Sequence, residues 1–135
     1  MNMNAIELKV DGSASIRSFH TTNGVFDYFK GIFDIVRCKE NLEYPYVLLV
    51  DDCGYEKGFA VNAYGSYFYG SGEHGHLIVG DVLIMKEVLD PEEGEYTLDG
   101  LSDEEISALS IKYEFCLEPI NPVQPVLDRA DDGRA

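Results

Sequence analysis

A continuous apolar run, Tyr46–Val50, restricts the fold of this chain more than any other segment. Pro45 precedes the run, and the turn-forming residues Asp51–Gly54 follow it. An unbroken apolar run of this length is typical of a strand buried on both faces, whereas a half-buried strand alternates polar and apolar residues. The run therefore predicts the central strand of a β-sheet.

Three further segments predict strands. Ile6–Val10 alternates apolar and charged residues with a period of two, as a half-buried strand does. Lys57–Val61 follows the central run after a glycine-containing turn, so these two segments are predicted to form a hairpin. Leu77–Met85 is a third apolar segment, interrupted at Gly80-Asp81, where a bulge or tight bend is expected. We therefore expect a mixed sheet of about four strands.

Two segments predict helices. Apolar residues recur at helical spacing over residues 23–37, with charged residues opposite, which favours an amphipathic helix packed on the sheet. Ser102–Glu105 forms a capping box that begins an acidic helix over residues 102–116. The sequence thus predicts a single α+β domain over residues 1–117, followed by a disordered tail, acidic and proline-rich, over residues 118–135.

The formal net charge of −15 limits the partners that the chain can bind. Residues 46–135 carry nineteen acidic and five basic side chains, a net charge of −14, whereas residues 1–45 are nearly balanced. Binding to a phosphate backbone or to an acidic membrane surface requires lysine and arginine, so neither nucleic acid nor a membrane is an expected direct partner. A field of one sign attracts molecules of the opposite sign, and we therefore expect a basic protein partner.

Cysteine usage and the first residues indicate the compartment. No apolar segment is long enough to span a bilayer, and residues 1–11 lack the basic and apolar parts of a signal peptide. Cys38, Cys53 and Cys116 are odd in number and widely spaced, which favours free thiols over a disulfide framework. We therefore expect a cytoplasmic protein.

The segments Gly58–Ala63 and Ile78–Leu83 resemble a family of small proteins of unknown function from bacteriophages, plasmids and conjugative elements. The family pattern joins a strand ending in an acid and glycine, a glycine–asparagine segment and an Ile-Val-Gly-Asp strand. Asp51–Gly54, Asn62 and Gly80-Asp81 occupy these places here, although the first helix has one glycine where the family usually has a pair. The resemblance implies a mobile-element origin and an accessory role, and it implies no catalytic residues.

Acidic residues gather in the last third of the chain and form the first candidate binding surface. The set comprises Asp90, Glu92, Glu93, Glu95, Asp99, Asp103, Glu104 and Glu105. One interpretation is a solvated face that keeps the protein soluble. The other is a surface for a basic macromolecule, including mimicry of a DNA duplex, which requires the carboxylates to lie along one elongated face. A non-enzymatic accessory protein that binds in this way is the leading hypothesis.

An aromatic segment with a following loop is the alternative candidate. Tyrosine suits half-wet contacts, so this segment predicts a pocket for a nucleotide or another metabolite, with the loop over residues 70–76 as its lid. The residues of this alternative site are Tyr64, Tyr67, Tyr69, His74 and His76.

Catalytic and metal sites are not predicted. Glu73–His76 offers several ligand side chains, but the surrounding glycines favour an exposed loop over a zinc site. Asp51 and Asp52 are explained by the turn that they begin, and their negative charge raises the pKa of Cys53, which opposes a thiolate nucleophile. No phosphate-binding loop or other cofactor motif is present.

Overall fold

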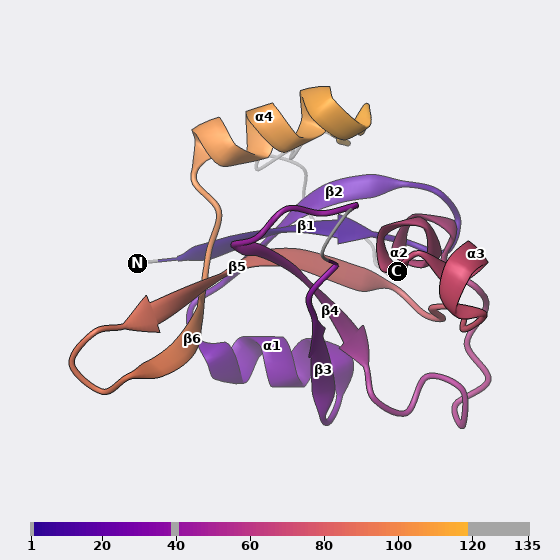
Figure 1. Cartoon of the computed structure of the whole chain (residues 1–135), viewed down its shortest axis with the longest axis horizontal. Coiled ribbons are helices and arrows are strands. Elements are labelled where there is room, and N and C mark those ends of the chain that lie inside the picture. The colour runs from indigo at the N-terminus through magenta and orange to yellow at the C-terminus, as the bar shows by residue number, and fades with distance from the viewer. Residues whose placement is uncertain (1, 39–40, 119–135) are drawn as a thin grey trace, which may run out of the picture.

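A sheet of six strands forms the middle of the structure, with helices on both faces of the sheet (Figure 1). The structure is a computed structural model that describes residues 2–38 and 41–118. Five strands lie in the order β2-β1-β5-β4-β3, and β6 pairs with the outer half of β5. All pairs of these strands are antiparallel. The strands are β1 (Met3–Leu8), β2 (Ala14–Phe19), β3 (Phe33–Val36), β4 (Tyr46–Asp51), β5 (Val82–Asp90) and β6 (Glu95–Asp99).

Side chains of alternate parity on the central strands build one core on each face. On one face, Leu48 and Ile84 pack with residues of α2 (Ala63–Tyr69) and α4 (Asp103–Tyr113). On the other face, Leu49 and Leu83 pack with residues of α1 (Thr22–Phe29). We call these the α4 face and the α1 face. The prediction that the run in β4 is a strand buried on both faces is confirmed.

The helix predicted over residues 23–37 is wrong in its second half. α1 ends at Phe29, because Lys30 takes a left-handed conformation with φ 55° and Gly31 follows with φ 151°. β3 then pairs with β4, from Phe33 opposite Asp51 to Val36 opposite Leu48. Phe29, Phe33 and Val36 fit helical spacing, but in β3 the side chains of Phe33 and Val36 pack on opposite faces of the sheet. Pairing with the open edge of β4 decides in favour of the strand.

The predicted strand over Lys57–Val61 is also wrong. Residues 52–58 form turns, and Val61 makes a single bridge to Val79 in place of a hairpin with β4. The strand expected from Leu77 begins only at Val82, and it continues to Asp90. One expected strand is thus lost, and β2, β3 and β6 were not predicted, so the sheet has six strands where about four were expected. The sheet is mostly antiparallel, with one isolated parallel bridge between Ala14 and Leu117.

The α+β class and the acidic helix are confirmed. Ser102 accepts a hydrogen bond from the Glu105 amide, and the Glu105 side chain accepts one from the Ser102 amide, which completes the predicted capping box of α4. The loop expected over residues 70–76 contains the short helix α3 (Ser71–His74). The tail predicted from residue 118 lies outside the described residues beyond Glu118 itself. Within the described ranges, no helix has the length and apolar character needed to cross a membrane.

Candidate functional site

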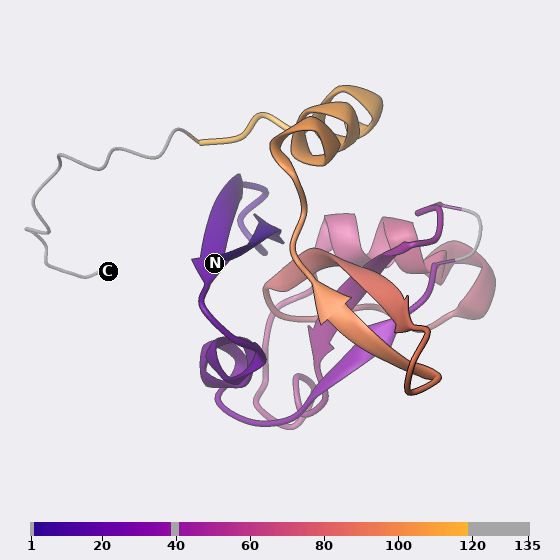
Figure 2. The same cartoon turned by 90° about the vertical axis from the view of Figure 1, so that its left-hand side faces the viewer.

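The β5–β6 hairpin projects from the sheet and carries most of the predicted acidic set (Figure 1). Its ladder runs from Lys86 opposite Asp99 to Asp90 opposite Glu95, and Glu92 and Glu93 lie in the turn between. The first turn of α4 lies at the same end of the molecule, which faces the viewer in Figure 2. We call the hairpin residues 89–99 together with residues 103–105 the acidic end.

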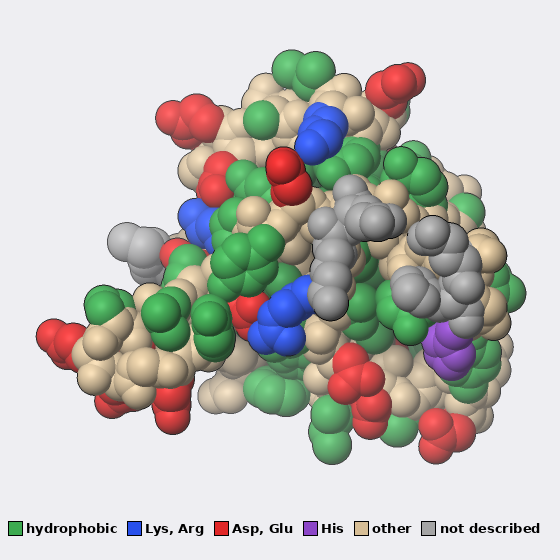
Figure 3. Space-filling model, in the orientation of Figure 1, with side chains coloured by type: hydrophobic (Ala, Val, Ile, Leu, Met, Phe, Trp, Pro, Cys, Tyr) green, Lys and Arg blue, Asp and Glu red, His purple; other side chains and the backbone are tan. Residues whose placement is uncertain are grey.

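Seven of the eight predicted carboxylates form no ion pair with any described residue. Glu105 is the exception, because it caps α4 and pairs with Lys86 Nζ at 3.0 Å. Asp90 and Asp99 accept hydrogen bonds from the backbone amides of Glu92 and Gly100, respectively. These bonds hold the turns, and because the donors are uncharged they do not neutralise the two carboxylates. Carboxylates project from the hairpin tip and from α4 in Figure 3, as two groups.

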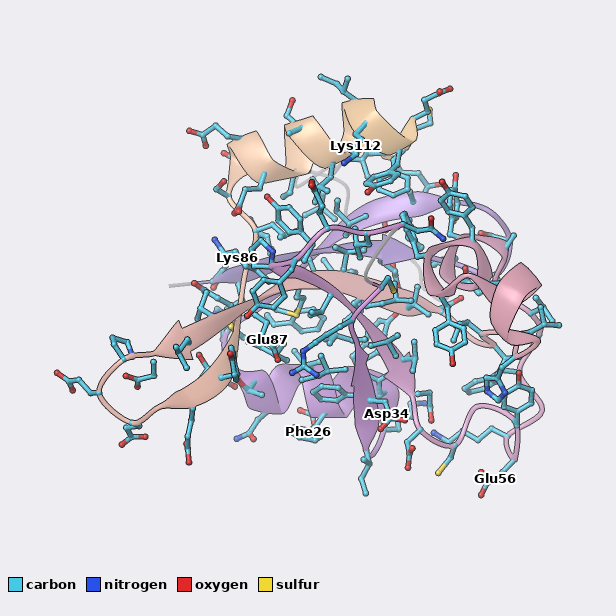
Figure 4. The ribbon with its side chains drawn as sticks, in the orientation of Figure 1. Phe26, Asp34, Glu56, Lys86, Glu87 and Lys112 are labelled. Atoms are coloured by element: carbon cyan, nitrogen blue, oxygen red, sulfur yellow. The ribbon has the colours of Figure 1, made fainter. Side chains whose placement is uncertain are left out.

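An exposed apolar pair lies within this acidic surface. Leu89 and Tyr96 are direct cross-strand partners, and each exposes more than half of its surface, 52% and 57% respectively. The base of the hairpin is fixed on the same face of the strands, because Arg37 Nε and Nη2 donate to the buried Glu87 carboxylate at 2.8 and 2.6 Å. Figure 4 shows Lys86 and Glu87 directed to opposite faces of β5. The hairpin therefore presents a well-anchored apolar contact with an acidic rim.

The predicted aromatic site is brought together only in part. Tyr64 and Tyr67 line a cavity of about 500 Å³ between α2, the end of α4 and the turn after β1. Tyr69 and His76 do not line this cavity; they contact each other, with ring centroids 6.2 Å apart. The side chain of His74 lies outside the described residues. We call this space the aromatic cavity.

Sequence reasoning missed the other wall of the aromatic cavity. Tyr113 and Phe115, at the end of α4, line it together with Lys112 and Lys9. Tyr113 is held by a hydrogen bond from its hydroxyl to the Asn41 carbonyl at 2.8 Å. The aromatic residues after the helix were visible in the sequence, but only the tertiary fold places them opposite α2.

The remaining candidates behave as structural groups. Asp51 accepts from the Cys53 amide and pairs with Lys57 at 2.8 Å, which is consistent with its predicted role in the turn. Burial, with the neighbouring acids Glu56, Asp52 and Asp51, raises the pKa of Cys53. The described residues contain no group of three or more histidine, cysteine, aspartate or glutamate side chains that could hold a metal ion.

Comparisons of the chain with protein-family models, with curated proteins and with solved structures find no match. The resemblance to the mobile-element family therefore stays a prediction, and the function is argued from the surfaces of this chain.

Proposed function

We propose that this chain is a binding protein that recognises a basic protein partner through the acidic end. The observation that carries the proposal is the exposed pair Leu89 and Tyr96 on a hairpin whose carboxylates form no ion pair with a described residue. The hairpin carboxylates are Asp90, Glu92, Glu93, Glu95 and Asp99, and Asp103 and Glu104 form a second group on α4. Protein interfaces combine an apolar centre that contains aromatic residues with a polar rim. The negative field of the rim attracts a basic partner over long range, and the apolar pair supplies contact energy once the surfaces meet.

The distribution of the carboxylates favours a basic protein patch as the complement. The hairpin and α4 carry separate groups of carboxylates, and the Lys86–Glu105 ion pair lies between them. A duplex mimic needs a continuous row of negative charge along one face. A protein with two basic patches around an apolar residue needs only the arrangement present here, and an accessory role in a mobile element is compatible with it.

The test is affinity capture from a lysate of the source organism at low and high salt, with a matched pair of charge-reversal variants. Glu92→Lys with Glu93→Lys reverses two exposed charges on the hairpin, whereas Asp27→Lys with Glu56→Lys reverses two exposed charges elsewhere. We expect salt-sensitive basic partners that the hairpin variant and Tyr96→Ser lose and the control variant retains. Equal loss in both charge variants would refute a specific site, because the attraction would then depend on net charge alone.

The aromatic cavity supports a second candidate function, binding of a nucleotide or another metabolite. Its volume of about 500 Å³ and its Tyr64, Tyr67 and Tyr113 walls are suited to a planar ligand. A ligand present at one hundred times its Kd stabilises the folded state by about 2.7 kcal/mol, so a thermal-shift screen detects it. We expect a shift that tolerates salt and is lost in Tyr67→Ala. A panel of nucleotides that leaves the melting temperature unchanged would exclude nucleotides from this candidate.

A further inference from the structure

A second cavity, of about 580 Å³, opens on the α1 face beyond the end of α1. Its sheet positions continue the rows that form the apolar core on this face: Glu7 follows Ala5 on β1, and Asp51 follows Leu49 on β4. The end of α1 and the segment Lys57–Ala60 form its walls. Charged side chains thus replace apolar ones where the sheet passes the end of the helix. We call this space the charged cavity.

The buried carboxylates of the charged cavity already have donors. Glu7, only 2% exposed, accepts from Ser15 Oγ at 3.0 Å and from the Tyr28 hydroxyl at 2.6 Å. Burial, reinforced by the hydrogen bond to Glu7, raises the pKa of Tyr28, so the phenol stays protonated and remains a donor. Asp51 accepts from Lys57 Nζ and from the Cys53 amide, each at 2.8 Å. These carboxylates are therefore engaged within the protein and are not the groups that await a ligand.

Asp81, the third carboxylate at the cavity, accepts from the Val10 amide at 2.9 Å. The rim of the cavity has donors in excess. Four of the seven lysines and arginines in the described ranges line it, namely Lys9, Arg17, Lys30 and Lys57.

The three described cations elsewhere, Arg37, Lys86 and Lys112, each pair with a glutamate. In contrast, Lys9 and Lys30 form no ion pair with a described carboxylate, and the Arg17 guanidinium lies 3.8 Å from Glu7. Among the described residues of this strongly acidic chain, the lysines without an ion pair therefore both lie at this cavity.

An apolar ring completes the cavity. Phe59 is 43% exposed, and its ring lies 5.7 Å from Lys57 Nζ. A Cβ atom on Gly80 would lie 2.8 Å from the Phe59 ring, so a glycine is required where the ring packs on the chain. The Gly80 amide donates to the Ala60 carbonyl at 2.8 Å, which joins the two walls. Asp51, Phe59 and Gly80-Asp81, from three separate segments of the chain, therefore line one cavity.

We propose that the charged cavity binds a small organic anion, a phosphate or carboxylate attached to an apolar ring. Each carboxylate at the cavity already accepts at least one hydrogen bond from the protein. In contrast, Lys30, Lys9 and Arg17 have protons to donate to an anion. The Phe59 ring contacts the apolar part of the ligand. This site is independent of the acidic end, and its ligand is opposite in charge to the proposed protein partner.

The test is titration with phenyl phosphate, benzoate and inorganic phosphate, followed by backbone amide shifts in two-dimensional NMR spectra. We expect phenyl phosphate or benzoate to shift amides of residues 28–31, 57–60 and 79–81, and inorganic phosphate to bind more weakly because it lacks the ring. The stronger of the two ring compounds identifies the anionic group. Lys30→Gln should weaken binding of that compound about tenfold, the effect of losing one hydrogen bond to a charged group, and Phe59→Ser should weaken it as well.

A stability measurement on Lys30→Gln and one further variant make the result decisive. Lys30 is exposed and forms no ion pair with a described residue, so Lys30→Gln should keep the melting temperature of the parent protein. This measurement separates loss of binding from loss of folding. Lys112→Gln removes the same charge at the aromatic cavity and should leave phenyl phosphate binding intact. Three outcomes would each overturn the proposal. The first is shifts confined to residues 64–67 and 112–115, and the second is equal affinity in Lys30→Gln. The third is no shifts at about 10 millimolar probe, roughly an order of magnitude above typical metabolite affinities.

Discussion

Asn62 ties three segments of the structure together, and its removal should be among the costliest single substitutions. Its side chain is fully buried, with 0% exposure. The amide nitrogen donates to the Leu8 carbonyl at 2.8 Å and to the Gly80 carbonyl at 2.9 Å, while the side-chain oxygen accepts from the Gly65 amide at 2.9 Å and caps α2. One residue therefore joins the end of β1, the approach to β5 and the start of α2.

The expected magnitude for Asn62→Ala follows from these three bonds. At about 1 kcal/mol for each net hydrogen bond, the loss of three bonds from this buried side chain should lower the free energy of unfolding by about 3 kcal/mol. Since small domains have a total stability of about 5–15 kcal/mol, the variant should still fold. With a urea dependence of about 1.5 kcal/mol per molar, the unfolding midpoint should fall by about 2 M.

Urea unfolding followed by circular dichroism measures this change, and two variants control it. Asn23→Ala removes an exposed asparagine from α1 and should change stability by at most about 0.5 kcal/mol. Asn62→Asp keeps the acceptor that caps α2 but loses both donors, so it should destabilise at least as much as Asn62→Ala. A loss under about 1 kcal/mol in Asn62→Ala, or a neutral Asn62→Asp, would refute the reasoning, because helix capping alone would then account for the residue.

Three further predictions concern other elements. Burial alone would raise the pKa of Glu105, but the N-cap amide and a lysine ion pair hold it below the ordinary value of 4.5. The folded state is therefore stabilised above that pH and loses this contribution as the pH falls through the lowered pKa, so melting temperatures between pH 5 and pH 3 should decline less steeply in Glu105→Gln. Gly100→Ala would place a Cβ atom 2.5 Å from the backbone nitrogen of Asn4, and overpacking of about 1–3 kcal/mol should lower the melting temperature by roughly 5–10 °C in calorimetry. Burial raises the pKa of Cys38 to about 11, whereas Cys116 is exposed, so iodoacetamide at pH 8 should label Cys116 first by mass spectrometry, and prior labelling of Cys38 would contradict the buried placement.

Local signals in the sequence are sufficient to predict a helix or strand where the segment determines its own structure. The capping box at Ser102 and the apolar run in β4 were identified correctly, because helix capping and burial on both faces leave a clear pattern. Residues 30–36 were assigned to a helix because Phe29, Phe33 and Val36 also fit helical spacing. The left-handed turn at Lys30 and the pairing with β4 depend on the rest of the sheet.

The sites show the same division between local and tertiary information. Tyr64 and Tyr67 were identified from their aromatic density, but Tyr113 and Phe115 join them only through the fold. Glu7 looked like the solvent-facing residue of a half-buried strand. The end of α1 covers it instead, and a polar position in an alternating pattern does not reveal which helix will reach it.

Among the described strands, β5 is the one that pairs with three others, and it also connects the two proposed binding sites. Asp81, immediately before it, borders the charged cavity, and Asp90, at its far end, begins the hairpin tip. The nine residues of extended chain from Val82 to Asp90 hold these points roughly 30 Å apart. The strand thus acts as a fixed spacer between the two proposed sites, so the proposals together predict that occupancy of the charged cavity leaves the acidic end free for a protein partner.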